Sequence, residues 1–150
     1  MEHDFKNYPE LTNSQMRMFY FDSPHKQITD DFEAEVVKVT DGDTIRVMTD
    51  FRDFNFPVRF LNIDAPEITK GKNEFGGKES QQWLSKMVLG KQIKVLIDED
   101  NRVEKWGRLL GEVLVDGLNV GELSLANGYS TKFEDRVDEQ FKAIKETELY

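Results

Sequence analysis

Cysteine is absent from this chain of 150 residues, and the two histidines, His3 and His25, both lie near the N-terminus. The lack of cysteine excludes disulfide bonds, thiolate zinc sites and thiol catalysis. Two histidines are also too few for a His-rich metal cluster. Any metal site must therefore be built from oxygen ligands, which favour a hard cation such as Ca²⁺ or Mg²⁺.

Long apolar runs and a basic leader are also missing. No apolar run approaches the ~20 residues that a membrane-spanning helix needs, and the first ten residues, MEHDFKNYPE, do not resemble a secretory signal. The sequence therefore predicts a soluble chain without a membrane partner, in the cytoplasm or another intracellular compartment.

Positive charge is scarce as well. The 20 Lys and Arg residues are outnumbered by 29 Asp and Glu residues, which gives a net charge of −9. Such a charge repels a polyanion at long range and argues against a nucleic-acid partner. A bound cation and a few basic residues can still make one cleft attractive, and solubility is the simplest reading of the acidity.

The apolar content is sufficient for one core. Hydrophobic residues make up 38% of the chain and include 11 phenylalanines, and the length predicts a single domain. Residues 1–33 have no clear period and are expected to be a partly ordered N-terminal extension, with the domain at 34–150. An apolar group in the extension, Met16 and Met18–Phe21, predicts packing on the domain, a protein partner or a second copy of the chain.

The hydrophobic pattern predicts five strands and three helices. The expected strands are Ala34–Val39, Thr44–Met48, Phe56–Ile63, Gln92–Ile97 and Trp106–Val115. The expected helices are Lys78–Leu89, Val120–Ala126 and Val137–Leu149. Five strands with a helix between the third and the fourth have the order of an OB barrel. The predicted fold class is therefore mainly β with α (α+β), a five-stranded OB-type barrel with about three helices.

Three carboxylates occupy positions that could serve a hard cation, which needs oxygens from separate chain segments. Asp43 follows a hairpin turn, Asp64 ends a predicted strand, and Glu67 lies just beyond Pro66. Taken singly, each has an ordinary explanation as a turn residue or a solvated side chain. The acidic segment at 98–102 resembles a calcium loop only superficially, because glycine is missing and a cation occupies a ligand position, so we expect a solvated loop there.

Two arginines could complement a phosphate, because the planar, always-charged guanidinium matches phosphate oxygens. Arg59 lies within the third predicted strand and Arg108 follows a glycine. Each alone would be an ordinary surface arginine. Arg59 and Asp64 are an odd number of residues apart, so a regular strand would point them to opposite faces. A shared site therefore requires a bend or bulge near Leu61–Ile63.

Three segments in order resemble the staphylococcal nuclease (thermonuclease) family. They are Val39–Thr44 (VTDGDT), Arg59–Glu67 (RFLNIDAPE) and Glu104–Arg108 (EKWGR). The resemblance extends from about Phe32 to Phe133. It implies an OB-type barrel that hydrolyses phosphodiester bonds of DNA or RNA, internally or from an end, and leaves 3′-phosphate products.

The resemblance also implies a cofactor and a water-handling residue. One Ca²⁺ ion, or another hard divalent cation, would be bound by the carboxylates of Asp43 and Asp64. A third ligand would be the main-chain carbonyl of Ala65. The family often has threonine at this position, but a main-chain oxygen is present whichever side chain is there. Glu67 corresponds to the general base or the residue that positions the attacking water.

The remaining implied roles concern the substrate. Arg59 and Arg108 correspond to the pair that binds the phosphate and stabilises the transition state. Lys105 and Trp106 are expected to contact the nucleic acid, with Trp106 standing where the family often has tyrosine. Tyr129 and Phe133 are loose candidates for a second stacking residue.

Two other functions remain open from the sequence. A barrel of this fold can be a non-catalytic module that binds nucleic acid or protein, although such modules typically lose the acidic and arginine residues that are present here. The extension could add a role in protein interaction or self-association through Met18–Phe21.

Overall fold

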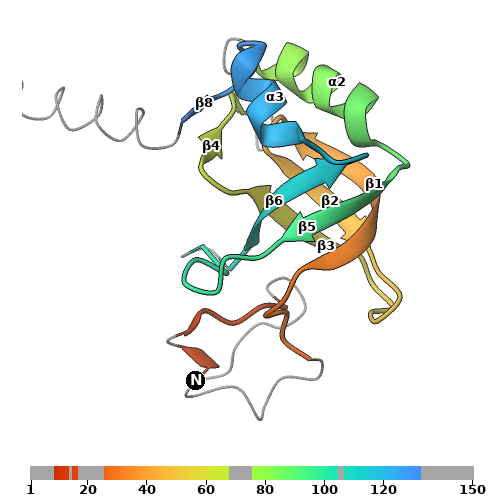
Figure 1. The fold of residues 1–150 in the computed structure, drawn as a ribbon, viewed down its shortest axis with the longest axis vertical. Coiled ribbons are helices and arrows are strands. Elements are labelled where there is room, and N and C mark those ends of the chain that lie inside the picture. The colour runs from red at the N-terminus through yellow and green to blue at the C-terminus, as the bar shows by residue number, and fades with distance from the viewer. Residues whose placement is uncertain (1–8, 14, 17–25, 68–75, 105–106, 133–150) are drawn as a thin grey trace, which may run out of the picture.

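The computed structural model describes residues 9–13, 15–16, 26–67, 76–104 and 107–132. Within these ranges the chain forms a closed five-stranded, OB-like barrel with two helices at one end (Figure 1). The predicted fold class is confirmed. The third predicted helix, Val137–Leu149, lies outside the described residues, as do Met18–Phe21, Lys105, Trp106 and Phe133.

The barrel is closed by one parallel strand pair. Its strands are β1 (Phe32–Asp41), β2 (Thr44–Met48), β3 (Phe56–Phe60), β5 (Gln92–Leu96) and β6 (Leu109–Val115). Antiparallel pairing gives the order β3-β2-β1-β5-β6, and β3 then pairs in parallel with β6. Arg59 is opposite Leu110 in this closing pair, so the two arginine-bearing segments become neighbours.

Alternation of apolar and polar residues places one face of each strand in the core, as a half-buried strand requires. Val58 and Phe60 of β3 point inward while Arg59 between them points to the outside of the core, and β6 is buried at every second residue. This alternation leaves the Arg59 side chain on the outer wall of the barrel, where a site can form. The largest buried side chains are Phe56, Phe60, Leu11, Ile45, Leu84 and Leu109.

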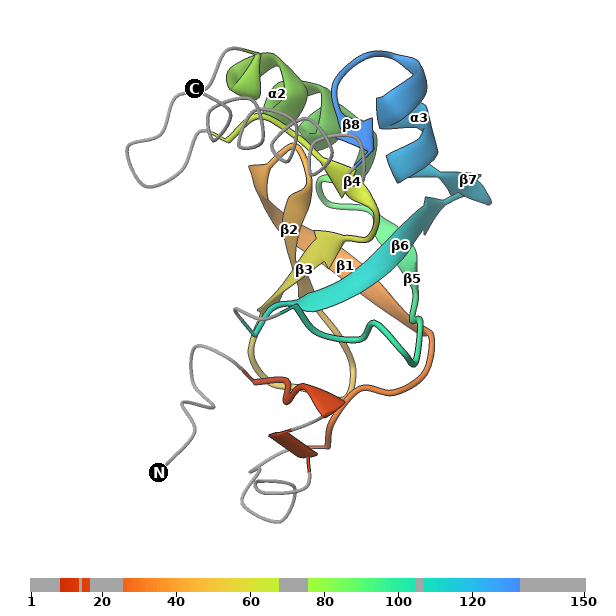
Figure 2. The same cartoon turned by 90° about the vertical axis from the view of Figure 1, so that its left-hand side faces the viewer.

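The third predicted strand is wrong in extent. β3 ends at Phe60, a turn follows at Leu61 and Asn62, and β4 (Ile63–Asp64) then leaves the barrel to pair with β8 (Thr131–Lys132) (Figure 2). Asn62 adopts a left-handed φ of 67°, a conformation that asparagine tolerates better than most residues. The bend that the Arg59–Asp64 spacing required is therefore confirmed, and it is a full turn rather than a bulge.

The two helices cover the end of the barrel at which β4 lies (Figure 1). Helix α2 (Gly77–Val88) packs on β1 through the buried Leu84, and α3 (Val120–Ala126) follows the short strand β7 (Leu118–Asn119). Both helices lie within one residue of their predicted bounds. Neither helix of the described part of the chain is long and apolar enough to cross a bilayer.

The turn between β1 and β2 lies directly under α2. A Cβ atom at Gly42 would lie 1.9 Å from Ser80 Oγ, 2.8 Å from Ser80 Cβ and 3.0 Å from Ala65 Cβ. Ser80 is buried, and its hydroxyl donates to the carbonyl of Tyr129 at 2.8 Å, so it is not free to move away. Only glycine allows the turn, β4 and the helix to approach so closely.

We therefore expect Gly42→Ala to lower the free energy of unfolding by about 1–3 kcal/mol, because it overpacks a tight contact. Urea unfolding of Gly42→Ala, Ser80→Gly and the double variant measures this. Since Ser80→Gly removes both clashing atoms, the double variant should be less destabilised than the sum of the single variants. Strict additivity would contradict the packing described here.

Candidate active site

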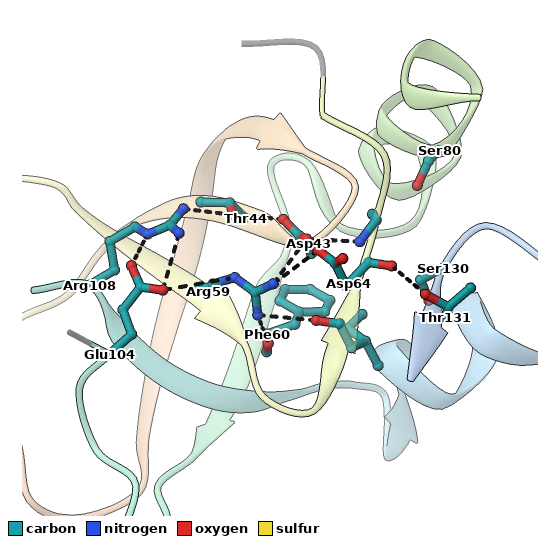
Figure 3. Close-up of polar contacts among 12 residues, drawn as sticks. Asp43, Thr44, Arg59, Phe60, Asp64, Ser80, Glu104, Arg108, Ser130 and Thr131 are labelled. Atoms are coloured by element: carbon teal, nitrogen blue, oxygen red, sulfur yellow. Dashed lines mark hydrogen bonds and ion pairs between the residues drawn. The ribbon is translucent and has the colours of Figure 1, made fainter. Parts of the chain in front are cut away.

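Asp43 occupies the β1–β2 turn, and its carboxylate connects that turn to β4. The side chain is buried, with 4% of the residue exposed. Its Oδ1 accepts a hydrogen bond from the Thr44 hydroxyl, and its Oδ2 accepts one from the backbone N–H of Ala65, both at 2.9 Å (Figure 3). The strand that carries Asp64 is therefore held beside Asp43.

Arg59 joins the two aspartates. Its Nη2 atom lies 3.4 Å from Asp43 Oδ2 and 3.3 Å from Asp64 Oδ1, so both carboxylates converge on one nitrogen (Figure 3). Its Nη1 atom donates to the carbonyls of Phe60 and Ile63, each at 3.0 Å. The turn after β3 thus wraps around the guanidinium and brings Asp64 back to the face from which Arg59 projects.

The pKa of Asp43 is raised above its ordinary value. The main cause is burial, which removes water from the ionised form, and the negative charge of Asp64 adds to it. Arg59 and the hydrogen bonds from Ala65 and Thr44 act in the opposite direction without cancelling these effects. Ionised Asp43 is therefore poorly compensated, and an added cation would stabilise it.

Arg108 is held by Glu104, a residue for which the sequence predicted no role of its own. Arg108 Nε and Nη2 both donate to the Glu104 carboxylate, with Nη2 at 3.1 Å from Oε2. Arg108 Nη1 lies 3.4 Å from the Thr44 hydroxyl, and Glu104 Oε2 lies 4.0 Å from Arg59 Nε. Glu104 therefore lies between the two arginines (Figure 3). Its i,i+4 spacing from Arg108 was the available sequence signal.

Glu67 lies close enough to influence Arg108 electrostatically. Burial lowers the pKa of the Arg108 guanidinium, but the hydrogen bond and charge of Glu104, followed by the charges of Asp43 and Glu67, raise that pKa above its ordinary value. Glu67 is half-buried and follows Asp64 by three residues. The five residues singled out in the sequence, Asp43, Arg59, Asp64, Glu67 and Arg108, are thus brought to one region.

The other predicted site residues have different outcomes. Ala65 is buried beside Asp43, as its N–H contact shows. Lys105 and Trp106 fall outside the residues that the structure describes. Tyr129 stacks on Trp83 of α2 with ring centroids 5.1 Å apart, so one face of its ring packs against protein.

The donor set suits a hard cation. The structure's described residues contain no group of three or more His, Cys, Asp or Glu side chains that could bind a metal by itself. Asp43 and Asp64 nevertheless bring two buried carboxylates to one point, and calcium sites commonly add main-chain oxygens and water to such a pair. Glu67 and Glu104 lie nearby, so the region contains four carboxyl groups and two guanidinium groups. Without a cation, a phosphate that entered this region would therefore meet a net negative charge.

The arrangement agrees with the comparison to known protein families. Residues 57–149 match the family described as staphylococcal nuclease homologue. The chain belongs to this family. The match includes Arg59, Asp64, Glu67 and Arg108, whereas Asp43 precedes it and is brought to these residues by its contact with Arg59.

Similar proteins occur in bacteria and yeast. An uncharacterized endonuclease from Escherichia coli O157:H7 is 35% identical over 105 residues, which cover 69% of this chain and 63% of that protein. Endonuclease YncB from Bacillus subtilis (strain 168) is 32% identical over 126 residues, covering 72% of this chain and 59% of that protein. A probable endonuclease from Komagataella phaffii is 32% identical over 102 residues, covering 61% and 42%. The chain thus spans less than two thirds of the length of these relatives.

The raised pKa of Asp43 predicts a stability change in Asp43→Asn. A carboxyl whose folded-state pKa is raised contributes stability below its ordinary pKa, and this contribution is lost as the pH rises through the folded-state pKa. In the presence of a chelator, Asp43→Asn should therefore have a higher Tm than the parent at pH 7, and the difference should shrink as the pH is lowered toward 4. Thermal melts of both proteins measure this.

Asp53→Asn, at an exposed position, is the matched control and should change the Tm little at any pH. A lower Tm for Asp43→Asn at pH 7 would show that the carboxylate is better compensated than the contacts indicate.

Proposed function

We propose that this protein is a Ca²⁺-dependent nuclease that hydrolyses phosphodiester bonds of DNA, RNA or both and leaves 3′-phosphate ends. The observation that carries the proposal is the convergence of two buried carboxylates, Asp43 and Asp64, next to two arginines. Membership of the staphylococcal nuclease family and relatives named as endonucleases support the same activity.

The cation would be held by the carboxylates of Asp43 and Asp64 and by the main-chain carbonyl of Ala65. When bound, it would neutralise a phosphate oxygen and the excess negative charge of the site. All of these ligands are hard oxygens, so Ca²⁺ is the proposed ion and another hard divalent cation could take its place. In the structure, Arg59 Nη2 supplies the positive charge between the two carboxylates.

The protein's own side chains would perform the remaining steps. Glu67 would accept or orient the proton of a water whose oxygen attacks phosphorus. The bond from phosphorus to the 5′-oxygen would break, the departing 5′-oxygen would take a proton from solvent to become a hydroxyl, and the phosphate would remain on the 3′-oxygen. Arg59 and Arg108 would donate to the non-bridging oxygens, whose negative charge increases in the transition state.

Substrate binding would extend beyond this centre. Lys105 and Trp106 follow Glu104 directly in the sequence and precede Arg108 by three and two residues. A lysine can neutralise a neighbouring phosphate, and an indole can stack on a base. We propose these two residues as substrate contacts.

Divalent-ion dependence tests the proposal directly. Incubation of the protein with single-stranded DNA, duplex DNA and RNA should give cleavage with Ca²⁺, and excess chelator should abolish it. End-group mapping should detect 3′-phosphates on the products. A protein that binds these nucleic acids with no chelator-sensitive cleavage, even at high concentration, would instead be the non-catalytic binding module.

Two substitutions test the assigned side chains. Glu67→Gln and Arg108→Ala should each lower kcat by about 10²–10³-fold, because each removes a group that acts on the transition state. Matched controls are Glu35→Gln, on an exposed position of β1, and Arg46→Ala, on β2, whose guanidinium donates to Asn55.

Both controls should retain kcat within about threefold, and circular dichroism should show that all four variants fold. Equal activity of Glu67→Gln and the parent would remove Glu67 from the mechanism.

A further inference from the structure

Glu10 of the N-terminal extension lies in a buried ionic cluster that the proposed chemistry does not use. Only 1% of the residue is exposed. Its Oε1 pairs with Arg52, its Oε2 lies 3.3 Å from Arg102 Nη2, and Oε2 also accepts from the backbone N–H of Ile28 at 2.9 Å. A buried carboxylate is retained only when such partners satisfy it, so the extension is docked specifically at this place.

The guanidinium of Arg102 is surrounded by residues of the extension. Its Nε donates to the Ile28 carbonyl at 2.8 Å, and its Nη1 donates to the Leu11 carbonyl and to Asn13 Oδ1, both at 3.1 Å. Its Nη2 donates to Glu10 and to the carbonyl of Ile28. Each nitrogen of the Arg102 guanidinium therefore contacts the extension, and Arg102 is 3% exposed.

Arg102 also begins the chain segment that presents Arg108. Its carbonyl accepts from the N–H of Leu110 at 2.8 Å, and the Glu104 N–H donates to the Arg108 carbonyl at 3.0 Å. A bridge between Val103 and Leu109 lies between these two bonds. Residues 102–104 and 107–110 thus form the two sides of a short hairpin, here called the arginine hairpin.

The arginine hairpin carries both Glu104 and the Arg108 side chain that Glu104 holds. Its pairing continues past Leu109, the first residue of β6, to the Glu104–Arg108 hydrogen bond. A two-stranded hairpin is marginally stable by itself. A contact that holds one of its strands therefore also limits the positions available to Arg108.

We propose that residues 9–13 and 26–28 are a clamp that fixes the arginine hairpin, and that Glu10 and Arg102 are positioning residues for Arg108. These residues lie outside the barrel strands, since β1 begins at Phe32. The clamp contacts the hairpin at Arg102, and Asn13 Nδ2 also donates to the Glu99 carbonyl at 3.1 Å on the loop before it. The effect on catalysis rests on the proposed nuclease function, whereas the effect on the hairpin does not.

Arg52 provides a matched control for Arg102. Both arginines are buried and both pair with Glu10, but Arg52 lies between β2 and β3, with its guanidinium 4.6 Å from the Phe56 ring centroid. Arg102→Lys and Arg52→Lys each keep the charge and lose the planar fork. If the cluster only stabilises the fold, the two variants will behave alike.

The first experiment measures kcat and KM of the full-length variants well below their unfolding temperatures. Both substitutions should lower the Tm by about 5–10 °C. Arg102→Lys should also lower kcat by about 10–100-fold, because a small displacement of a catalytic group is costly, while Arg52→Lys should stay within about threefold of the parent. Equal kcat values for the two variants would overturn the positioning role.

The second experiment does not depend on nuclease activity or on replacing a buried arginine. Asn13 is exposed, so Asn13→Ala should fold while losing contacts to Arg102 and Glu99. Amide hydrogen exchange at Glu104 and Leu110 should become about 3–10-fold faster, with exchange at Val47 in β2 unchanged.

Unchanged exchange at Glu104 and Leu110 would refute the clamp even in an active nuclease. If exchange at Glu104 and Leu110 becomes faster but the parent protein shows no cleavage, the clamp is supported and only the proposed nuclease function is refuted.

Discussion

The burial of two carboxylates against one guanidinium nitrogen is the constraint on which the site depends. Asp43 and Asp64 are 4% and 9% exposed, and both lie within hydrogen-bond reach of Arg59 Nη2. This geometry explains why the chain leaves the barrel after β3, because a continuous strand would point Asp64 away from Arg59. It also explains the glycine at position 42, which lets β4 and α2 close over the turn that carries Asp43. The pKa of Asp43 stays raised despite these partners, mainly because the carboxyl is buried.

Local patterns were sufficient to predict the barrel. The strands alternate buried and less buried residues, and the helices have apolar residues at helical spacing, so the order of the five barrel strands and the bounds of α2 and α3 agree with the structure. The short strands β4, β7 and β8 were not predicted. The break at Asn62 was indicated only by the odd Arg59–Asp64 spacing. The local sequence from Phe56 to Asp64 fits one long strand as well as it fits a shorter strand followed by a turn. In the acidic segment at 98–102, which we expected to be a solvated loop, Asp98 accepts from the N–H of Asp100 and from the Asn101 side chain in a local turn.

Contacts between segments that are distant in the sequence could not be predicted from local patterns. Glu10 and Arg102 are separated by most of the chain, and neither has a local pattern that distinguishes it from an exposed charge. Glu104 resembled an ordinary acidic neighbour of Arg108, and its position between two arginines depends on the parallel pairing of β3 with β6. Residue types and spacing therefore predicted a set of groups that the structure brings together, whereas the tertiary fold determines which other side chains hold them.

The parallel pairing of β3 with β6 also has a consequence during synthesis. Arg59 and Leu110 become neighbours only when the intervening stretch of about 50 residues has folded back, which is a slow, entropically costly closure. Asp64 is further supported by β8, whose Thr131 pairs with it. A nascent chain therefore cannot bring the two arginines and two aspartates together until the segment through Leu110 has been translated. The topology thus makes assembly of these four side chains a late step in synthesis.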